Sequence, residues 1–393
     1  MISSVLPTYN RAPLQFTKGE GSWLTTVDGR RLLDLGSGIA VNVLGHAHPA
    51  LVTALTDQAQ NLWHVSNLYD IPQQQALADK LVETSFADTV FFTNSGTEAC
   101  ELAIKMARKY WHDKGQPDKT DIITFEGAFH GRSSAAIAAV NTPKMVEGFG
   151  PLLPGFAQVP WRDSDALLAA ITDTTGAIMI EPVQGEGGIR ALPDAELKAL
   201  RTLCDERDIL MICDEVQCGV GRTGKLFAHE WAGITPDIMM VAKGIGGGFP
   251  LGAVLATEDA ASGMVAGTHG STYGGNPLGC AVGKAVLDIV AEPAFLDDVN
   301  AAAGLLRQKL EGLVASHPTI FEDVRGSGLM LGLRCVVPVG EVVQAGYDQD
   351  VITVPAADNV ARLLPALNIT KEDINEAISR LDAAATELET QAG

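Results

Sequence analysis

Residues 209–250 most constrain what this chain can fold into, because they hold two apolar runs that each lead to a charged side chain. Residues 209–213 form a short, uncharged run that predicts a buried strand, and Asp214 follows it directly. The second run, residues 237–242, leads into Lys243 and a glycine-rich break. Ligands of α/β sheets bind where the strands end. The pattern therefore predicts that Asp214 and Lys243 enter one pocket.

The chemistry of this pair points to a cofactor. A lysine amine can form an imine with an aldehyde, and a carboxylate opposite it can hold a protonated ring nitrogen. Pyridoxal 5′-phosphate requires both groups of its enzyme. An ordinary salt bridge between Asp214 and Lys243 is the alternative, and it would be the better explanation if these two residues stood alone.

The composition of the chain excludes several classes of partner. With 393 residues, 46% of them hydrophobic, the chain can bury a large core and is expected to form two domains. A net charge of −20 argues against nucleic acid and anionic membranes as partners, because both are polyanions. No apolar run approaches the roughly 18 residues of a membrane span, and residues 1–20 lack the apolar core of a secretory signal. We therefore expect a soluble, cytoplasmic protein.

Neither the cysteines nor the histidines indicate a metal site. The six cysteines form no CxxC pair and show no metal-ligand spacing, so we expect reduced, mostly buried thiols. His46 and His48 lie two positions apart, but no carboxylate or third histidine follows at the spacing that a metal site needs. We therefore expect no bound metal ion.

Residues 91–110 predict a strand, a turn and a helix, because apolar residues recur at helical spacing after the turn. The turn contains Ser95, Gly96 and Thr97. A helix N-terminus with free backbone N–H groups and nearby hydroxyls can bind an anion. A plain N-cap by Ser95 or Thr97 is the alternative interpretation, and it would be preferred if this turn were considered by itself.

Two further loops follow strands that we expect to be buried. Residues 122–139 predict a strand, a turn and a helix, with Phe129 and Arg132 in the turn. Residues 177–190 predict another strand, which ends in a glycine-rich turn containing Glu186. Considered singly, Phe129 would be a core residue, Arg132 a solvated cation and Glu186 a solvated carboxylate.

Two stretches strongly resemble the class III (ω-type) aminotransferases of fold type I. They are DEVQCGVGRTGK, which starts at Asp214, and AKGIGGGFPLGA, which contains Lys243. The resemblance covers nearly the whole chain, from Gly19 to the acidic C-terminal helix. Five other stretches are most similar to the acetylornithine aminotransferase branch: LDLGSGIAVNVLGHAHP, NLWHVSNLY, FHGRS, GSTYGGNPLGCA and RLLPALNI.

The alternation of strands and helices predicts an α/β fold with a mostly parallel sheet, and the resemblance implies the fold of the type I pyridoxal phosphate transferases. A large domain would hold this sheet, wound by helices, and a smaller α+β domain would come from both termini. The expected division is 1–52 for the N-terminal part of the small domain, 53–285 for the large cofactor-binding domain and 286–393 for the C-terminal part of the small domain.

The resemblance also implies roles for individual residues toward pyridoxal 5′-phosphate. Lys243 would hold the cofactor and act as acid and base, and Asp214 would keep its ring nitrogen protonated. Thr272 would reach across a dimer interface to the cofactor phosphate of a partner subunit, so a homodimer with shared active sites is expected. The remaining implied contacts are to the phosphate, the two ring faces and the ring hydroxyl: Ser95, Gly96 and Thr97; Phe129 and Val216; and Gln217.

For the substrates, the resemblance implies that Arg132 and Arg362 bind carboxylates. Ser271 is expected in the substrate site beside them. Glu186 would cover Arg362 while acetylornithine reacts and swing away for glutamate, because a buried arginine needs a partner. Ile39 falls where relatives that act on free ornithine usually carry a tyrosine.

The implied reaction transfers the terminal amino group of N-acetylornithine to 2-oxoglutarate, giving N-acetylglutamate semialdehyde and glutamate, in arginine biosynthesis. The alternatives are another amino donor (free ornithine, succinyl-ornithine, succinyl-diaminopimelate or 4-aminobutyrate) and a cofactor-binding relative without turnover. Ile39 argues against free ornithine, and the presence of both Lys243 and Asp214 argues against a relative without turnover. The sequence does not rank the acylated donors, because their selection depends on the shapes of loops.

Overall fold

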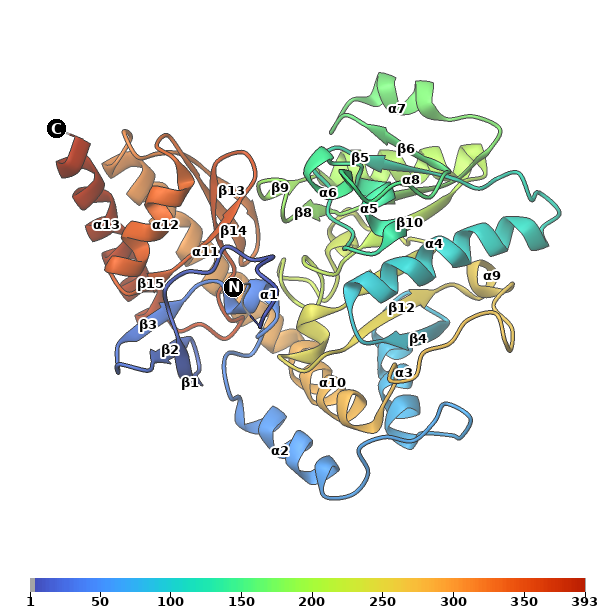
Figure 1. The fold of residues 1–393 in the computed structure, drawn as a ribbon, viewed down its shortest axis with the longest axis horizontal. Coiled ribbons are helices and arrows are strands. Elements are labelled where there is room, and N and C mark those ends of the chain that lie inside the picture. The colour runs from blue at the N-terminus through green and yellow to red at the C-terminus, as the bar shows by residue number, and fades with distance from the viewer. Residues whose placement is uncertain (1–3, 393) are drawn as a thin grey trace.

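The structure, a computed structural model, describes residues 4–392. Its centre is a seven-stranded sheet in the order β4-β12-β11-β10-β7-β5-β6 (Figure 1). All neighbouring strands are parallel except at β12, which runs antiparallel to both β11 and β4. The strands of this sheet are β4 (Thr89–Thr93), β5 (Asp121–Phe125), β6 (Phe156–Val159), β7 (Thr175–Ile180), β10 (Leu210–Asp214), β11 (Ile238–Val241) and β12 (Gly252–Ala256).

The central strands are buried on both faces. In β10, Met211 and Cys213 belong to one hydrophobic cluster, whereas Ile212 belongs to a second cluster that includes α4 and α5. Helices therefore cover both faces of the sheet, which explains why β10 is an uninterrupted apolar run rather than an alternating one. The helices around this sheet are α2 (Pro49–Ala59), α3 (Pro72–Thr84), α4 (Gly96–Asp113), α5 (Ser134–Val140), α6 (Pro143–Val146), α7 (Ser164–Ala170), α8 (Asp194–Arg207), α9 (Glu258–Ala261) and α10 (Pro277–Val290).

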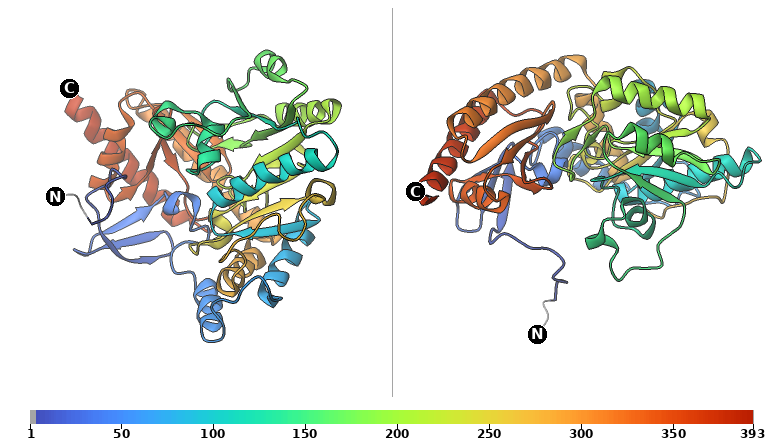
Figure 2. Two further views of the ribbon diagram at one scale, coloured as in Figure 1. Left: turned by 45° about the vertical axis from the view of Figure 1, so that its right-hand side comes forward. Right: turned by 90° about the horizontal axis from the view of Figure 1, so that it is seen from above.

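Both ends of the chain form a smaller body beside the large sheet (Figure 1). Its two sheets have the orders β1-β2-β3-β15 and β13-β14-β17-β16, so the C-terminal β15 pairs with the N-terminal β3. Figure 2 shows α11 running from the larger body along the smaller one. The elements are β1 (Phe16–Glu20), β2 (Trp23–Thr26), β3 (Arg31–Asp34), α1 (Ser37–Ala40), α11 (Pro293–Ser316), β13 (Phe321–Ser327), β14 (Met330–Cys335), α12 (Val339–Asp348), β15 (Val351–Ile352), β16 (Val354–Ala356), β17 (Val360–Leu363) and α13 (Lys371–Ala392).

This architecture confirms the expected α/β class with a mostly parallel sheet. Residues 284–316 do not form one continuous helix but contain the end of α10 and all of α11. The break precedes Pro293, which lacks a backbone N–H and suits the first turn of a new helix. The domain boundaries at residues 52 and 285 remain predictions, and both fall inside helices, α2 and α10.

Membrane spans and metal sites, which the sequence argued against, can both be looked for in the structure. Of the helices within residues 4–392, none combines the length and the apolar character that a bilayer span requires. Across the same residues, no group of three or more His, Cys, Asp or Glu side chains is arranged to hold a metal ion. His46 instead contacts Asp34, with 2.8 Å between Nε2 and Oδ2.

Candidate active site

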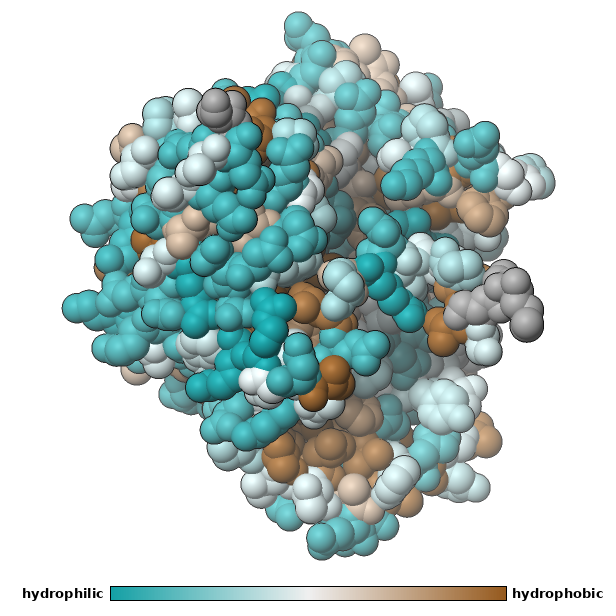
Figure 3. Space-filling view, turned by 60° about the vertical axis from the view of Figure 1, so that its left-hand side comes forward, coloured by the Kyte–Doolittle hydropathy of each residue, from teal (hydrophilic) through white to brown (hydrophobic). Residues whose placement is uncertain are grey.

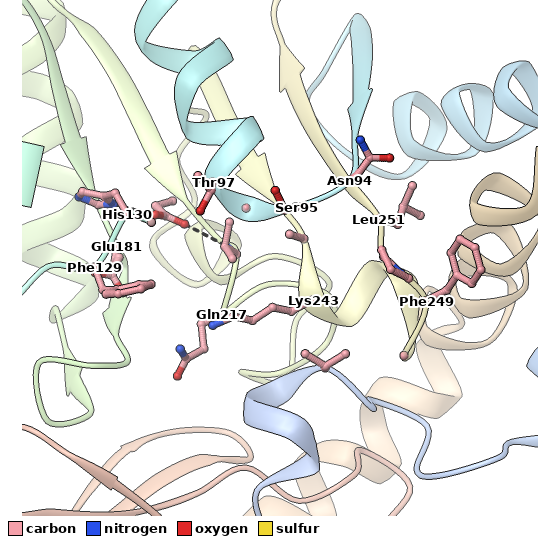
Figure 4. A pocket seen from close by; sticks show the side chains of 18 residues that line it. Asn94, Ser95, Thr97, Phe129, His130, Glu181, Gln217, Lys243, Phe249 and Leu251 are labelled. Carbon is pink, nitrogen blue, oxygen red and sulfur yellow. Dashed lines mark hydrogen bonds and ion pairs between the residues drawn. The ribbon is translucent and has the colours of Figure 1, made fainter. Parts of the chain in front are cut away.

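A cavity of about 350 Å³ lies at the carboxyl ends of β10 and β11. Asp214 is the last residue of β10, and Lys243 begins a 3-10 turn (η2, Lys243–Gly246) just after β11. Because the two strands are adjacent and parallel, both side chains line the same cavity. Figure 4 shows Lys243 extending toward Gln217, with Phe129, His130 and Glu181 across the cavity. The predicted meeting of the acid and the lysine is found in the structure.

Two donors fix the Asp214 carboxylate in place. The side chain is only 3% exposed. Its Oδ1 accepts a hydrogen bond from the backbone N–H of Val216 at 3.0 Å, and its Oδ2 lies 2.7 Å from Nδ1 of His130. Burial alone would lower the pKa of His130, but the hydrogen bond and the charge of Asp214, with Glu181 adding to them, raise it above its usual value. The site thus favours the positively charged form of His130 beside the buried carboxylate.

His130 is a site residue to which the sequence analysis gave no role. Its imidazole is buried: Nδ1 contacts Asp214, and Nε2 has no hydrogen-bond partner. The signal was present in the sequence, since His130 directly follows Phe129 in the loop after β5. The contact joins side chains 84 positions apart, which no local pattern indicates.

One end of the cavity is formed by the start of α4. Ser95 is the N-cap, and its hydroxyl accepts the backbone N–H of Glu98 at 3.2 Å. Ser95, Gly96 and Thr97 all line the cavity. A Cβ on Gly96 would lie 2.8 Å from Cγ1 of Val216, so only glycine allows this close approach. The N-cap by Ser95 is therefore present, and the same turn borders the cavity, where the free N–H groups of a helix start suit an anion.

Phe129 and Val216 both line the cavity; their contact with the two faces of the cofactor ring stays a prediction. The backbone N–H of Phe129 donates to Oε1 of Glu181 at 2.8 Å. Arg132 lies three residues further on, exposed, with its guanidinium carbon 5.5 Å from the centre of the Phe129 ring. Its backbone N–H donates to the Thr97 hydroxyl at 3.3 Å, which ties this loop to the start of α4.

Arg362, on β17 of the smaller body, is 1% exposed and meets two partners. Its Nη1 donates to Oε1 of Glu186 at 2.6 Å and to Oε1 of Gln217 at 2.9 Å. The expected cover of Arg362 by Glu186 is thus present. Gln217 was expected at the ring hydroxyl of the cofactor, and it lines the cavity, but its amide oxygen also accepts from Arg362.

Six predicted residues do not line the Lys243 cavity within this chain: Arg132, Glu186 and Arg362, described above, and Ile39, Ser271 and Thr272. Ile39 lies in the kinked α1 with its side chain 37% exposed. Ser271 accepts the backbone N–H of Gly274 at 2.9 Å. Together with Thr272 it borders a separate surface hollow formed with the segment around His64. A role for Thr272 in the same chain's cavity therefore finds no support in the geometry.

The electrostatics of the cavity suit an amine that reacts. Burial lowers the pKa of the Lys243 amine below its ordinary 10.5, and the charge of Arg362 lowers it further. Burial and the charge of Asp214 raise the pKa of the Glu181 carboxyl to about 7, against the opposing effects of His130 and of two backbone N–H groups. Perturbed groups of this kind gather where proton transfer occurs.

These groups fit pyridoxal 5′-phosphate in number and kind. The cavity offers an amine for the aldehyde, a buried carboxylate for the ring nitrogen, a helix N-terminus for the phosphate, and an aromatic ring and a valine for the two ring faces. An α/β fold with this site defines a pyridoxal phosphate-dependent enzyme of fold type I.

Comparison with known proteins gives the family. The profile described as "Aminotransferase class-III" matches residues 5–385. The chain is 72% identical to an acetylornithine aminotransferase of Rhodobacter capsulatus over 391 residues, covering 100% of both chains. It is 59% identical to an acetylornithine aminotransferase of Mesorhizobium japonicum, covering 98% of this chain and 96% of that one. The chain belongs to the class-III aminotransferases.

Solved structures agree with this family. An ornithine aminotransferase from Toxoplasma gondii superposes with a TM-score of 0.95 at 29% identity, covering 99% of this chain and 94% of that one. An N-acetylornithine aminotransferase from Stenotrophomonas maltophilia superposes with a TM-score of 0.86 at 37% identity, covering 98% of each chain. The same fold is therefore found in a protein named for ornithine and in one named for N-acetylornithine.

Lys243 of the cofactor-free protein should react with small aldehydes at unusually low pH. A lowered pKa leaves more amine neutral near pH 8 to 9, so the labelling rate should rise with pH through a midpoint below 10.5. Reductive methylation followed by peptide mass spectrometry measures this. Arg362→Gln should move the midpoint upward, because it removes a positive charge. A wild-type midpoint at or above 10.5 would contradict the expectation.

Proposed function

We propose that the protein transfers the terminal amino group of N-acetylornithine to 2-oxoglutarate. The observation that carries this proposal is the Arg362–Glu186 pair beside Lys243, since a covered arginine suits an enzyme that alternates between donors with one and two carboxylates. The 72% identity to an acetylornithine aminotransferase supports the choice of donor. Arginine biosynthesis is the pathway that this reaction would serve.

Lys243, Asp214 and His130 then have separate tasks. Pyridoxal 5′-phosphate, when bound, supplies a ring that accepts electrons and carries the amino group between the two half-reactions. Lys243 Nζ accepts the proton from the substrate carbon and donates it again as general acid. Asp214 holds a proton on the ring nitrogen, and His130 positions Asp214 through the 2.7 Å contact.

Two arginines sort the substrates. Acetylornithine reacts at the end remote from its carboxylate, and Arg132 at the exposed edge of the Phe129 ring is suited to bind that carboxylate. Glutamate brings a second carboxylate close to the reacting carbon, where Arg362 lies buried. Glu186 neutralises Arg362 during the first half-reaction and moves aside in the second. Gln217 keeps its hydrogen bond with Arg362 in both half-reactions.

The strongest alternative is free ornithine as donor, because an ornithine aminotransferase is among the similar structures. Ile39 disfavours it. An apolar side chain stands where relatives acting on ornithine carry a tyrosine hydroxyl, and a polar group of the substrate without a partner is costly to bury. The remaining acylated donors share the same carboxylate and differ only in the acyl end.

We further propose a homodimer in which Thr272 serves the partner's cofactor phosphate. Large apolar side chains are exposed around this residue, which lies beside the segment of His64: the rings of His64 and Tyr273 are 5.1 Å apart. Figure 3 shows hydrophobic surface gathered over the lower part of the molecule, where α2 and α10 lie. Such surface marks an interface. The exposed side chains are Leu62, Trp63, Leu68, Tyr69 and Tyr273.

A cytoplasmic location completes the proposal. All six cysteines are free and buried, which suits a reducing compartment.

The donor is tested with a panel assayed against 2-oxoglutarate. N-acetylornithine should give the highest kcat/KM, at least about tenfold above free ornithine, which corresponds to about 1.4 kcal/mol of transition-state discrimination. The panel includes succinyl-ornithine, succinyl-diaminopimelate, ornithine and 4-aminobutyrate, and Lys243→Ala is the inactive control. A higher kcat/KM for ornithine or 4-aminobutyrate would overturn the choice of donor.

We call Glu186 a gate because it is proposed to cover Arg362 in one half-reaction and to move aside in the other. This role is tested by Glu186→Ala. The change leaves Arg362 open, so the glutamate half-reaction should gain relative to the acetylornithine one. Single-turnover release of 2-oxoglutarate or of N-acetylglutamate semialdehyde measures each half-reaction separately. Equal changes in both rates, or a selective loss with glutamate, would show that Glu186 is no gate.

Sharing of sites is tested by mixing two inactive chains, Lys243→Ala and a Thr272 variant such as Thr272→Glu. If Thr272 serves the partner subunit, each mixed dimer has one site with both lesions and one with neither. Activity should return on subunit exchange, to about a quarter of wild type for random pairing of equal amounts and an equally active intact site. Each chain incubated alone is the control. No recovery would place the contact of Thr272 within one chain.

A further inference from the structure

Glu181 is a buried carboxylate that the reaction described above does not use. It directly follows β7, as Asp214 ends β10, and it is 5% exposed. Its Oε1 accepts the backbone N–H of Phe129 at 2.8 Å, and its Oε2 accepts the backbone N–H of Gly185 at 3.2 Å. One carboxylate thus joins the loop that carries Phe129 to the turn that carries Glu186.

The turn around Glu186 is fastened on both sides. Before Glu186, the N–H of Gly185 is held by Glu181; at Glu186, the backbone carbonyl accepts the N–H of Ala357 at 2.9 Å. Ala357 lies between β16 and β17, and β17 carries Arg362. The backbone around Glu186 is therefore tied to the large sheet through Glu181, and to the segment before β17, the strand of Arg362, through Ala357.

Packing leaves this turn little room to shift as a whole. A Cβ on Gly185 would lie 2.2 Å from Oε1 of Gln217, and one on Gly187 would lie 2.6 Å from the carbonyl oxygen of Gly127. The closely packed backbone favours movement of Glu186 through its side-chain torsions. A fixed backbone is what lets a carboxylate return to a 2.6 Å contact after each cycle.

We propose that Glu181 is a positioning residue that fixes the closed position of the Glu186 gate and couples it to the loop of Phe129. The inference rests on the proposed gating by Glu186. A carboxylate can accept both N–H groups, whereas a carboxamide has one oxygen and leaves one N–H without an acceptor. Weakening this anchor should therefore favour the open gate, in which Arg362 is free to bind a second carboxylate.

Glutarate measures the open gate without turnover, because it has two carboxylates and no amine or keto group. Its affinity for the holoenzyme, by calorimetry, is limited by the need to displace Glu186 from Arg362. Glu181→Gln should bind glutarate about fivefold more tightly, the fold-change of about one lost hydrogen bond. Pentanoate, with one carboxylate, should bind unchanged. Amide hydrogen exchange at Gly185 should be faster in the variant.

Three variants separate this role from charge and from stability. Glu181→Asp keeps the charge but shortens the reach, so it should also tighten glutarate binding, and it replaces Glu181→Gln if that variant does not fold. Glu215→Gln is the matched control, because Glu215 is also a buried carboxylate that accepts two backbone N–H groups, those of Ala228 and His229. It should leave glutarate affinity unchanged. In a Glu186→Ala background, Glu181→Gln should add no further gain.

The outcomes distinguish the gate role of Glu186 from the positioning role of Glu181. If Glu186→Ala alone does not tighten glutarate binding, the gate itself fails. If Glu186→Ala tightens it but neither Glu181 variant does, or if exchange at Gly185 is unchanged, only the role of Glu181 fails. Tightening in Glu181→Gln but not in Glu181→Asp would assign the effect to charge and overturn the positioning role.

Discussion

The parallel pairing of β10 and β11 is the constraint on which the rest of the site depends. It brings the ends of two buried strands to one edge of the sheet. Asp214 and Lys243 therefore line one cavity, although they lie 29 positions apart in the sequence. Helices on both faces hold these strands, and the loop after β5 adds His130 to the same edge. A reactive amine and a buried acid thus follow from sheet topology, before any loop contributes specificity.

Burial of charge is the second theme of the structure. Asp214 and Arg362 are both almost inaccessible, and each meets an opposite charge within 2.7 Å: His130 for the first, Glu186 for the second. The two pairs differ in exposure, because His130 is buried whereas Glu186 is partly open to solvent. A buried pair is costly to separate, and a half-open partner can leave more readily. The buried pair is therefore suited to a permanent role beside the cofactor, and the half-open pair to exchange with substrates, as proposed above.

Much of the fold and part of the site could be predicted from local sequence. Asp214 and Lys243 follow apolar runs directly, and Ser95 lies just before a helical pattern, so their positions are encoded within a few residues. The pairing of Arg362 with Glu186, 176 positions apart, was expected only from the family resemblance. The contact of His130 with Asp214 was not expected at all, because residues distant in sequence leave no local pattern when a tertiary contact joins them.

The negative charge of the whole molecule has a consequence for how substrates arrive. The chain carries a net charge of −20, while only two arginines are proposed to receive carboxylates: Arg132, which is exposed, and Arg362, which is hidden behind Glu186. A doubly anionic acceptor therefore approaches against the long-range field, whereas a zwitterionic donor with one carboxylate and one ammonium group does not. Added salt screens that field over about 10 Å at 0.1 M. Ionic strength should thus quicken capture of 2-oxoglutarate more than that of the amino donor, so the balance of the two half-reactions depends on the salt around the enzyme.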